Sequence, residues 1–436
     1  MIEIRKKFLK GQKNMKKFLA LALALCMVFA LAACGGSSAP AASEAPAESA
    51  APAAPEAKEP IKLTVWVGDN YPAVTEKMVE SFKAAYPDET FEITIGIESE
   101  STCKDTILTD PEAAADVFTF ADDQLNALVN AGAIQKVEMN VDTITAANTA
   151  GAIAAASVDG TLYAYPMSAS NGYFLFYDSN FFTEEDIQSL NTMCEKAAAE
   201  GKSIGMQFGA DGGWYLYSFF KGAGLNMVIN DDGVTNSCDW NNETGVAVCQ
   251  GILDLVATGA FIADSTSNLV SGAADGSVVA LVDGTWDSGA IQEAFGDGYA
   301  CAKLPTFNVN GEAVQMSSFA GYKLIGVNPH SANVGWAMLL AEWLTNEENQ
   351  ILRFEDPNCG DGPSNVNAAA SEAVASNPAL VALAAQSEFA TVQRVAGNYW
   401  SNAATLGTIL SNGNPDGTPL NELLDTAVAG ITAPVA

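Results

Sequence analysis

The chain has 436 residues, 49% of them hydrophobic, and a formal net charge of −32. This length is enough for a large core that is divided between two lobes. The 52 acidic residues against 20 basic ones make nucleic acid and anionic lipid surfaces poor partners, because a phosphate polymer needs clustered cations. We favour a soluble surface in a salty medium over a cation-binding role as the reason for the acidity.

The N-terminus is predicted to be a targeting segment. Seven basic residues between Arg5 and Lys17 precede an apolar run from Phe18 to Leu31. This run is shorter than the about 20 residues that a membrane-spanning helix needs. The pattern therefore indicates a secretory signal that is not part of the fold.

The segment ends in Leu31-Ala32-Ala33-Cys34, which resembles a bacterial lipobox. The resemblance implies a signal peptide over residues 1–33, a diacylglyceryl group on Cys34, and a place on the extracellular face of the cell membrane. Ordinary cleavage with an incidental cysteine is the alternative, but the cysteine fits only lipidation.

Residues 34–60 are rich in Ala, Pro, Ser and Glu, so they are predicted to be an unfolded tether.

In the rest of the chain, β-strand and helix patterns alternate. They predict, in chain order, a strand over 61–69, a helix over 73–88, strands over 90–98 and 115–123, a helix over 124–134, two extended runs over 160–182, and strands over 203–209, 277–284 and 322–328. Such alternation indicates α/β layers with mainly parallel sheets.

The helix predicted around residues 333–348 illustrates how a core tryptophan is spaced in this sequence. Trp336, Leu339, Leu340, Trp343 and Leu344 form one apolar stripe at helical spacing. Both tryptophans are therefore predicted to lie in the core.

A different pattern recurs where predicted strands end. An aromatic residue with polar neighbours follows the strand or opens the next helix at four places: Trp66 with Asp69, Phe120 with Asp122 and Asp123, Trp214 with Tyr215, and Trp286 with Asp283 and Asp287. In open α/β sheets, ligands bind beyond the carboxyl ends of the strands. We therefore expect these side chains to meet in one crevice, although core packing is the alternative for each ring taken singly.

This combination of rings and acids suits a sugar. A pyranose has an apolar face that stacks on an aromatic ring, and its hydroxyls donate strong hydrogen bonds to carboxylates. A buried polar group left unpaired costs about 1–3 kcal/mol, so such a site rejects molecules that lack hydroxyls. Tyr399-Trp400 is a fifth candidate segment, in which the register leaves open whether Trp400 faces the core or the cleft.

The six cysteines after Cys34 and the lone His330 bear on other kinds of site. An exported chain permits disulfides, but six cysteines allow 15 full pairings, and the spacing selects none of them. Because there is no CxxC motif and no second histidine, we expect neither a zinc site nor a Ser-His-Asp triad.

Four blocks of the sequence resemble the extracellular solute-binding proteins of carbohydrate ABC importers, the group that contains the maltose/maltodextrin-binding protein. They are "ADVFTFADDQLNALVNAGAIQKV" (115–137), "VDGTLYAYPMSASNGYFLFYDSNFF" (158–182), "DGSVVALVDGTWDSGAI" (275–291) and "AGYKLIGVNPHSANVGWAMLLAEWLTNEENQ" (320–350). Maltodextrin binders often have Trp at the position of Phe120, Arg at that of Gln124, and GPW for the GTW that contains Trp286. These departures leave the exact sugar open.

The resemblance implies a periplasmic-binding-protein-like α/β fold, with two α/β lobes joined by hinge strands and a ligand cleft between them. Residues 61–165 plus 321–366 would form the first lobe, and residues 166–320 plus 367–436 the second. By position, stacking and hydroxyl binding would fall to Phe120, Asp123, Trp214, Trp286 and Trp400, with Asp69 as an additional contact. The complete set of predicted ligand-binding residues is Trp66, Asp69, Phe120, Asp123, Trp214, Tyr215, Trp286, Tyr399 and Trp400.

We therefore expect a monomeric, lipid-anchored binding protein that is not an enzyme and needs no cofactor or metal. It would capture an oligosaccharide, with maltose or maltodextrin as the first candidate, and deliver it to ABC permease subunits in the membrane. One alternative is the same fold with a polyamine or another small solute, since tryptophans beside carboxylates also hold cationic amines. The other is a surface glycoside hydrolase, which needs two carboxylates about 5–9.5 Å apart.

Overall fold

The computed structural model describes residues 59–209, 213–230 and 232–434. The predicted signal peptide, Cys34 and the predicted tether up to residue 58 lie outside this part of the chain. Among the described residues, no helix combines the length and the apolarity that crossing a membrane requires.

The first third of the described chain alternates strands and helices as the sequence predicts. Its elements are β1 (Ile61–Val67), α2 (Pro72–Ala85), β2 (Phe91–Ile97), α3 (Cys103–Thr109), β3 (Val117–Ala121), the 3-10 turn η1 (Asp122–Gln124), α4 (Leu125–Asn130), α5 (Val141–Ala147), α6 (Ala150–Ala155), β4 (Ser157–Val158) and β5 (Thr161–Leu162). In helix α2 the local sequence explains the helix. Pro72 occupies its first turn, where proline is favoured, and its buried residues Val74, Met78 and Phe82 follow one another at helical spacing.

The middle third begins with a long strand. Its elements are β6 (Tyr165–Asp178), α7 (Leu190–Ala199), β7 (Ser203–Met206), α8 (Gly213–Gly222), β8 (Met227–Ile229), β9 (Asn236–Cys238), α9 (Glu243–Ala257), β10 (Phe261–Ile262), α10 (Thr266–Asp275), β11 (Val278–Gly284), the 3-10 turn η3 (Thr285–Asp287), α11 (Ser288–Phe295), β12 (Tyr299–Ala302), β13 (Thr306–Val309) and β14 (Glu312–Gln315).

The last third begins with a second long strand and is otherwise mostly helical. Its elements are β15 (Ser318–Val327), α12 (Val334–Leu344), α13 (Glu347–Glu355), α14 (Val366–Ala369), α15 (Glu372–Ala375), α16 (Pro378–Ser387), β16 (Ala390–Val392), α17 (Asn398–Ser411) and α18 (Leu420–Ile431).

The main sheet is mixed, whereas the sequence predicted mainly parallel sheets. Its order is β10-β7-β11-β6-β15-β3-β1-β2, with β12 added to β6 and β16 added to β15. Strand β1 is parallel to β2 and β3, and β7 is parallel to β10 and β11. The difference comes from the two long strands, because β6 is antiparallel to β11, β12 and β15, and β15 is antiparallel to β3.

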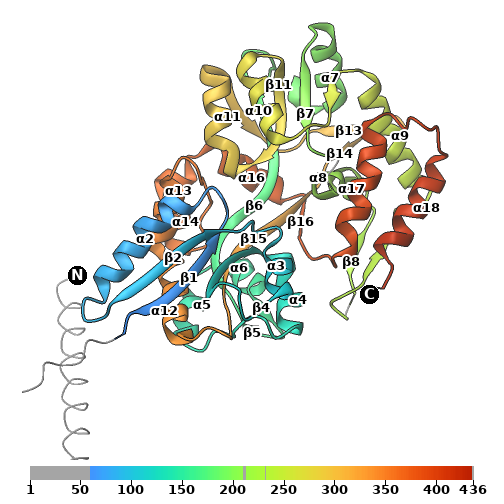
Figure 1. The fold of residues 1–436 in the computed structure, drawn as a ribbon. Coiled ribbons are helices and arrows are strands. Elements are labelled where there is room, and N and C mark those ends of the chain that lie inside the picture. The colour runs from blue at the N-terminus through green and yellow to red at the C-terminus, as the bar shows by residue number, and fades with distance from the viewer. Residues whose placement is uncertain (1–58, 210–212, 231, 435–436) are drawn as a thin grey trace, which may run out of the picture. The chain divides into compact units, whose positions relative to one another are not determined.

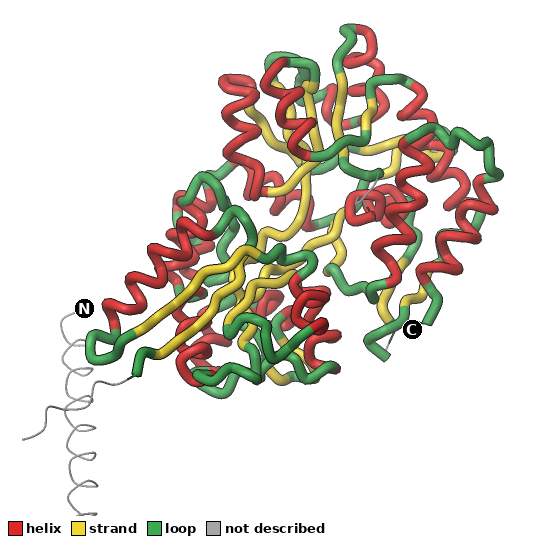
Figure 2. Tube along the Cα trace, in the orientation of Figure 1, coloured by secondary structure: helices red, strands yellow, loops and turns green. Residues whose placement is uncertain are grey.

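These two long strands connect the two lobes (Figure 1). In β6, residues 165–172 pair with β15, and residues 173–178 pair with β11 and β12. In β15, residues 318–320 pair with β16, and residues 323–327 pair with β3. Figure 2 shows the strands running through the middle of both lobes with helices outside them. The prediction of two α/β lobes joined by hinge strands is confirmed.

Each lobe has its own hydrophobic core. The first-lobe core gathers residues from β1, β3, α2 and α12, among them Val65, Phe82, Phe118 and Leu340. The second-lobe core gathers residues from β6, α8, α9 and α17, among them Tyr173, Phe219, Ile252 and Tyr399. The exact residues at which one lobe gives way to the other stay a prediction.

The predicted core tryptophans of α12 lie at the edge of the first-lobe core. Leu340 and Leu344 are buried, but Trp336 and Trp343 are only half-buried. The ring of Trp336 packs edge-on against Tyr86, with ring centroids 5.2 Å apart. Since the apolar stripe of α12 is wider than the face that meets the sheet, its largest side chains cover the rim of the core.

The six cysteines of the described chain are free. Cys103, Cys194, Cys249 and Cys359 are buried, and Cys238 and Cys301 are half-buried. Burial raises the pKa of the Cys249 thiol to about 12, so this thiol stays protonated.

Candidate functional site

A cavity of about 710 Å³ lies between the two lobes, and both of them line it. From the first lobe come the segments that follow β1, β2 and β3. From the second lobe come the first residues of α8, the turn η3 and the first turns of α17. Since parallel strands present their carboxyl ends at one edge of a sheet, the first-lobe segments meet there.

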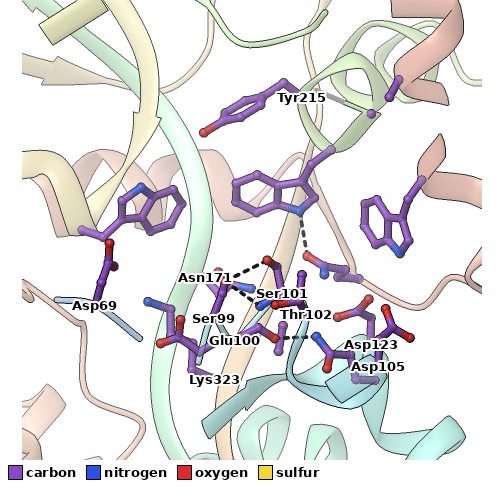
Figure 3. A pocket seen from close by; sticks show the side chains of 18 of the residues that line it. Asp69, Ser99, Glu100, Ser101, Thr102, Asp105, Asp123, Asn171, Tyr215 and Lys323 are labelled. Carbon is purple, nitrogen blue, oxygen red and sulfur yellow. Dashed lines mark hydrogen bonds between the residues drawn. The ribbon is translucent and has the colours of Figure 1, made fainter. Parts of the chain in front are cut away.

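The first-lobe side of the cavity is acidic and hydroxyl-rich. Its carboxylates are Asp69, Glu100, Asp105 and Asp123, and its hydroxyls are Ser99, Ser101 and Thr102. In Figure 3 these acids lie on the side of the cavity opposite Tyr215. We call this surface the acidic face.

The second-lobe side is aromatic. Trp214 and Tyr215 stand in the first turn of α8, Trp286 in η3 and Trp400 in α17. The rings of Trp214 and Trp286 are 5.7 Å apart between centroids, and Trp214 also packs edge-on against Tyr173 at 4.6 Å. All three tryptophans are half-buried, so each leaves part of its ring for a ligand. We call this surface the aromatic face.

Lys323 is the only basic residue among the described residues that line the cavity. Its Nζ donates to the Tyr71 hydroxyl at 2.5 Å and lies 3.4 Å from Oδ1 of Asp361. Burial lowers its pKa, but the Asp361 and Glu100 carboxylates outweigh burial and raise it. The positive charge of Lys323 is therefore already compensated by the Asp361 and Glu100 carboxylates, so it is a poor binding group for an anionic ligand.

Two carboxylates of the acidic face have oxygens that lack a partner. Glu100 Oε1 and Asp123 Oδ1 are buried without a hydrogen bond from the protein. Burial raises the pKa of Glu100, and it raises that of Asp123 to about 6. An unpaired buried acceptor costs about 1–3 kcal/mol. Hydroxyl donors of a ligand would offset this cost.

A further buried carboxylate, that of Asp122, lies directly behind the acidic face. Its Oδ1 accepts a hydrogen bond from the Tyr322 backbone nitrogen at 3.2 Å, in hinge strand β15. Burial and the neighbouring Asp123 raise the pKa of Asp122 to about 8. Asp122 is thus mostly protonated at neutral pH, while Asp123 is mostly ionised.

Asp283 and Asp287, the two acids beside Trp286, do not line the cavity, which corrects the expectation that they would meet the other strand-end side chains in one crevice. Asp283 is fully buried, and its Oδ1 accepts hydrogen bonds from the Gly284 nitrogen at 2.7 Å and the Tyr215 hydroxyl at 3.3 Å. Burial and the nearby Asp287 raise the pKa of Asp283 to about 7. Asp283 therefore fixes the turn and orients Tyr215 from behind.

The cavity brings together six of the nine predicted ligand-binding residues: Asp69, Asp123, Trp214, Tyr215, Trp286 and Trp400. The side chain of Cys34, the predicted lipidation site, lies outside the described residues. Within the described residues, no group of three or more His, Cys, Asp or Glu side chains is placed to hold a metal ion.

The other three predicted residues lie elsewhere, which corrects their expected place in the cleft. Phe120 is 0% exposed, because strand β3 is covered on both faces and all five of its residues are buried. The Trp66 ring lies over Gly96 of the neighbouring strand β2. Tyr399 is also 0% exposed, and its hydroxyl donates to the Gly213 carbonyl at 2.6 Å, so it supports the start of α8.

Several residues of the cavity were not found from the sequence. Glu100 belongs to the polar run Glu98–Thr102 directly after β2, so the strand-end pattern could have identified it if it had not required an aromatic residue. Asn171, Lys323 and Gln393 come from the hinge strands and from the segment after β16. No local sequence signal marks these three, because long-range strand pairing brings them to the cavity.

The comparisons with known proteins agree with this architecture. The family described as bacterial extracellular solute-binding protein matches residues 77–382. The galactooligosaccharide-binding protein of Bacillus subtilis (strain 168) is 29% identical over 285 residues, which are 63% of this chain and 66% of that protein. The match therefore spans slightly less than two thirds of that relative.

Solved structures show the same fold. One, described as "with acarbose", is 31% identical, with a TM-score of 0.76 over 86% of this chain and 99% of the other. The maltodextrin-binding protein MalE1 from L. casei BL23, solved without ligand, is 24% identical, with a TM-score of 0.72 over 86% of this chain and 100% of the other. The chain belongs to the family of bacterial extracellular solute-binding proteins.

Proposed function

We propose that the chain is the substrate-binding component of a carbohydrate ABC importer and that its cavity holds an oligosaccharide. One observation carries this proposal: three indole rings on one lobe face carboxylates and hydroxyls on the other across a cavity of about 710 Å³. That volume is in the range of small-molecule sites. The names of two relatives, one galactooligosaccharide-binding and one solved with acarbose, support the same class of ligand.

In this proposal the ligand acts by holding the lobes together. The aromatic face stacks on the apolar side of a sugar ring, and the acidic face accepts hydrogen bonds from its hydroxyls. Because the two faces belong to different lobes, only a closed arrangement satisfies the whole ligand. Binding therefore shifts the population toward the closed state, which would be the form presented to the permease.

The site residues of this proposal come from both the sequence and the structure. The sequence supplied Asp69, Asp123, Trp214, Tyr215, Trp286 and Trp400, and the geometry of the cavity adds Glu100. In this proposal the carboxylates only accept hydrogen bonds and cleave no bond of the ligand, so the sugar is released from the cavity chemically unchanged.

The proposal also includes the anchor predicted from the lipobox. A lipid on Cys34 would keep a monomeric receptor on the extracellular face of the membrane, close to its permease. Cell fractionation tests this part: a Cys34→Ala variant is expected in the soluble fraction and the native chain in the membrane fraction. Equal membrane association of both would overturn the anchor alone.

The charge of the cavity favours a cationic amine as a second candidate ligand. The acidic face has four carboxylates, while Lys323 is already balanced by Asp361. Indole rings also bind cations, with about 0.5–2 kcal/mol per contact.

Titration calorimetry with malto-oligosaccharides, galacto-oligosaccharides and spermidine tests both candidates. We expect one-to-one binding of a neutral oligosaccharide, accompanied by a rise in melting temperature, and recovery of the intact sugar after hours of incubation. If no neutral oligosaccharide gives heat or a thermal shift, the proposal fails. A response to spermidine alone would favour the second candidate, and cleaved sugar would indicate an enzyme.

A further inference from the structure

Hinge strand β15 reaches the cavity through the side chain of Lys323. The next residue, Leu324, is buried in the first-lobe core, and the pairing of β15 with β6 shifts register on both sides of Lys323. Irregular strand pairing of this kind re-aims side chains. Lys323 therefore lines the cavity although it is only 8% exposed (Figure 3).

Two buried neighbours hold the Lys323 ammonium in place. Tyr71 and Asp361 are each 2% exposed, and the Tyr71 hydroxyl donates to Oδ2 of Asp361 at 2.8 Å. Lys323 donates to the same hydroxyl and to the other oxygen of the carboxylate. Because these three groups are bonded to one another and shielded from water, the ammonium cannot move without breaking contacts that are costly to lose.

The same ammonium lies over a stacking ring of the aromatic face. Its Nζ is 5.6 Å from the centroid of the Trp286 ring, which is within the range of about 6 Å for a cation–π contact. Among the tryptophans of the described chain, only Trp286 has a lysine or arginine in this position. The contact joins a hinge strand to the turn η3 of the second lobe.

This contact determines what the Trp286 ring can still bind. A ligand ammonium is attracted to the π electrons of an indole, but at Trp286 an ammonium of the protein already occupies that position. A second cation on the ring would lie close to the first, in surroundings that screen their repulsion poorly. The Asp361 carboxylate compensates the charge of Lys323 but does not free the ring. The apolar side of an uncharged sugar unit meets no such repulsion.

We propose that Lys323 is a specificity-determining residue, whose ammonium occupies the cation-binding position of Trp286 and thereby reserves this ring for an uncharged sugar unit over a cationic amine. The acidic face attracts amines through its four carboxylates, and Lys323 opposes that attraction at the ring. The inference rests on the proposed function for the sugar, whereas the exclusion of amines is testable without any sugar.

The spermidine affinity of a charge-neutral double variant tests this role. Lys323→Met keeps an unbranched side chain without the charge, and Asp361→Asn removes the carboxylate that would otherwise stay buried without its cation. Since one positive and one negative charge are removed together, the net charge around the cavity does not change. Calorimetry at neutral pH should show about 2- to 30-fold tighter binding of spermidine than to the native protein, the strength of one cation–π contact.

The dependence on Trp286 distinguishes this role from a general effect of charge. In a Trp286→Leu background the same double substitution should give no such gain, because no indole ring is released. An equal gain with and without Trp286 would overturn the inference. Lys303→Met is the matched control, since its Nζ lies 5.2 Å from the centroid of the Phe389 ring but Lys303 does not line the cavity. Its spermidine affinity should equal that of the native protein.

The outcomes for spermidine and for sugar separate this inference from the proposed function. Thermal melting checks that the double variant is folded, and Lys323→Gln, which retains an amide donor, is the second variant with the same expected gain. If the folded variants bind spermidine no more tightly than the native protein does, or not at all, the inference is wrong. If they gain affinity through Trp286 but the native protein binds no neutral oligosaccharide, Lys323 excludes amines and the proposed function fails.

Discussion

The two faces of the cavity divide the recognition of a ligand between them. The acidic face offers carboxylates and hydroxyls from loops that follow parallel strands, and the aromatic face offers half-buried rings from α8, η3 and α17. A sugar ring has both an apolar side and a hydroxyl rim. Neither lobe alone can satisfy such a molecule, so the division itself favours closure around it.

The two faces also differ in how many of their polar atoms have a hydrogen-bond partner without a ligand. On the aromatic face, Trp214 already has a partner for its indole nitrogen and a ring packed against it. On the acidic face, Glu100 and Asp123 keep buried oxygens without a partner. A substitution on the aromatic face should therefore remove contact area, whereas one on the acidic face should remove hydrogen bonds and charge.

The largest loss of affinity is expected from Trp286→Ala. Removing a stacking ring from the middle of a cleft costs about 2–3 kcal/mol, or about 30- to 150-fold in Kd. Calorimetry with the best oligosaccharide measures this loss, and thermal melting of the ligand-free variant should show only a small decrease.

Trp336→Ala provides the control for this prediction. Trp336 is also half-buried, but it packs against Tyr86 and Phe91 at the rim of the first-lobe core. Its removal should lower the melting temperature and leave Kd unchanged. If Trp286→Ala behaves like Trp336→Ala, then Trp286 serves packing and the aromatic face is not a binding surface.

The next largest effect is expected from Asp123→Asn. The substitution keeps the shape but removes a charged acceptor, which costs about 1.5–3 kcal/mol, or about 10- to 150-fold in Kd. Asp105→Asn should have a much smaller effect, because the Asp105 carboxylate is exposed and pairs with Lys104 at 3.0 Å. Equal effects at the two positions would mean that the acidic face acts through its overall charge and not through specific hydrogen bonds.

The buried acid behind the acidic face should make stability depend on pH. The pKa of Asp122 is raised from 3.8 to about 8, so the folded state binds its proton more tightly than the unfolded state does. The resulting stability is complete below about pH 4 and is lost as pH rises from there through 8. Denaturant unfolding of the ligand-free protein should therefore show a lower free energy at pH 8 than at pH 6.

Asp122→Asn should flatten this dependence, because asparagine keeps an acceptor for the Tyr322 nitrogen and does not titrate. Asp232→Asn is a suitable control, since Asp232 is fully exposed and its pKa is lowered by hydrogen bonds from Thr235. An equally steep profile in Asp122→Asn would assign the dependence to other groups, of which Asp283 is the first candidate.

The smallest effect is expected from Asp69→Asn. Asp69, like Asp105, is an exposed carboxylate of the acidic face, where water competes for each hydrogen bond and salt screens the charge. We expect a change of about two- to fivefold in Kd. A loss as large as that of Asp123→Asn would show that Asp69 is enclosed by the second lobe in the bound state.

Local sequence patterns were enough to predict most of the elements and much of the cleft. The strand-end pattern identified Asp123 and Trp286, because the carboxyl ends of parallel strands lie at one edge of the sheet. It failed at Phe120, since the pattern does not reveal on which side of a doubly covered strand a ring will point. Lys323 and Gln393 could not be found locally, because they reach the cavity only through the pairing of β15 with β3, β6 and β16.

Strand β15 has a consequence for how the molecule can be divided. Its Phe319 stacks on Tyr217 in the second-lobe core at 3.8 Å between centroids, and five residues later Leu324 is fully buried in the first-lobe core. Strand β6 contributes to both cores in the same way. No single cut in the chain yields a fragment with one intact core. The lobes are therefore interleaved and not modular, and neither should be obtainable as an independently folding fragment.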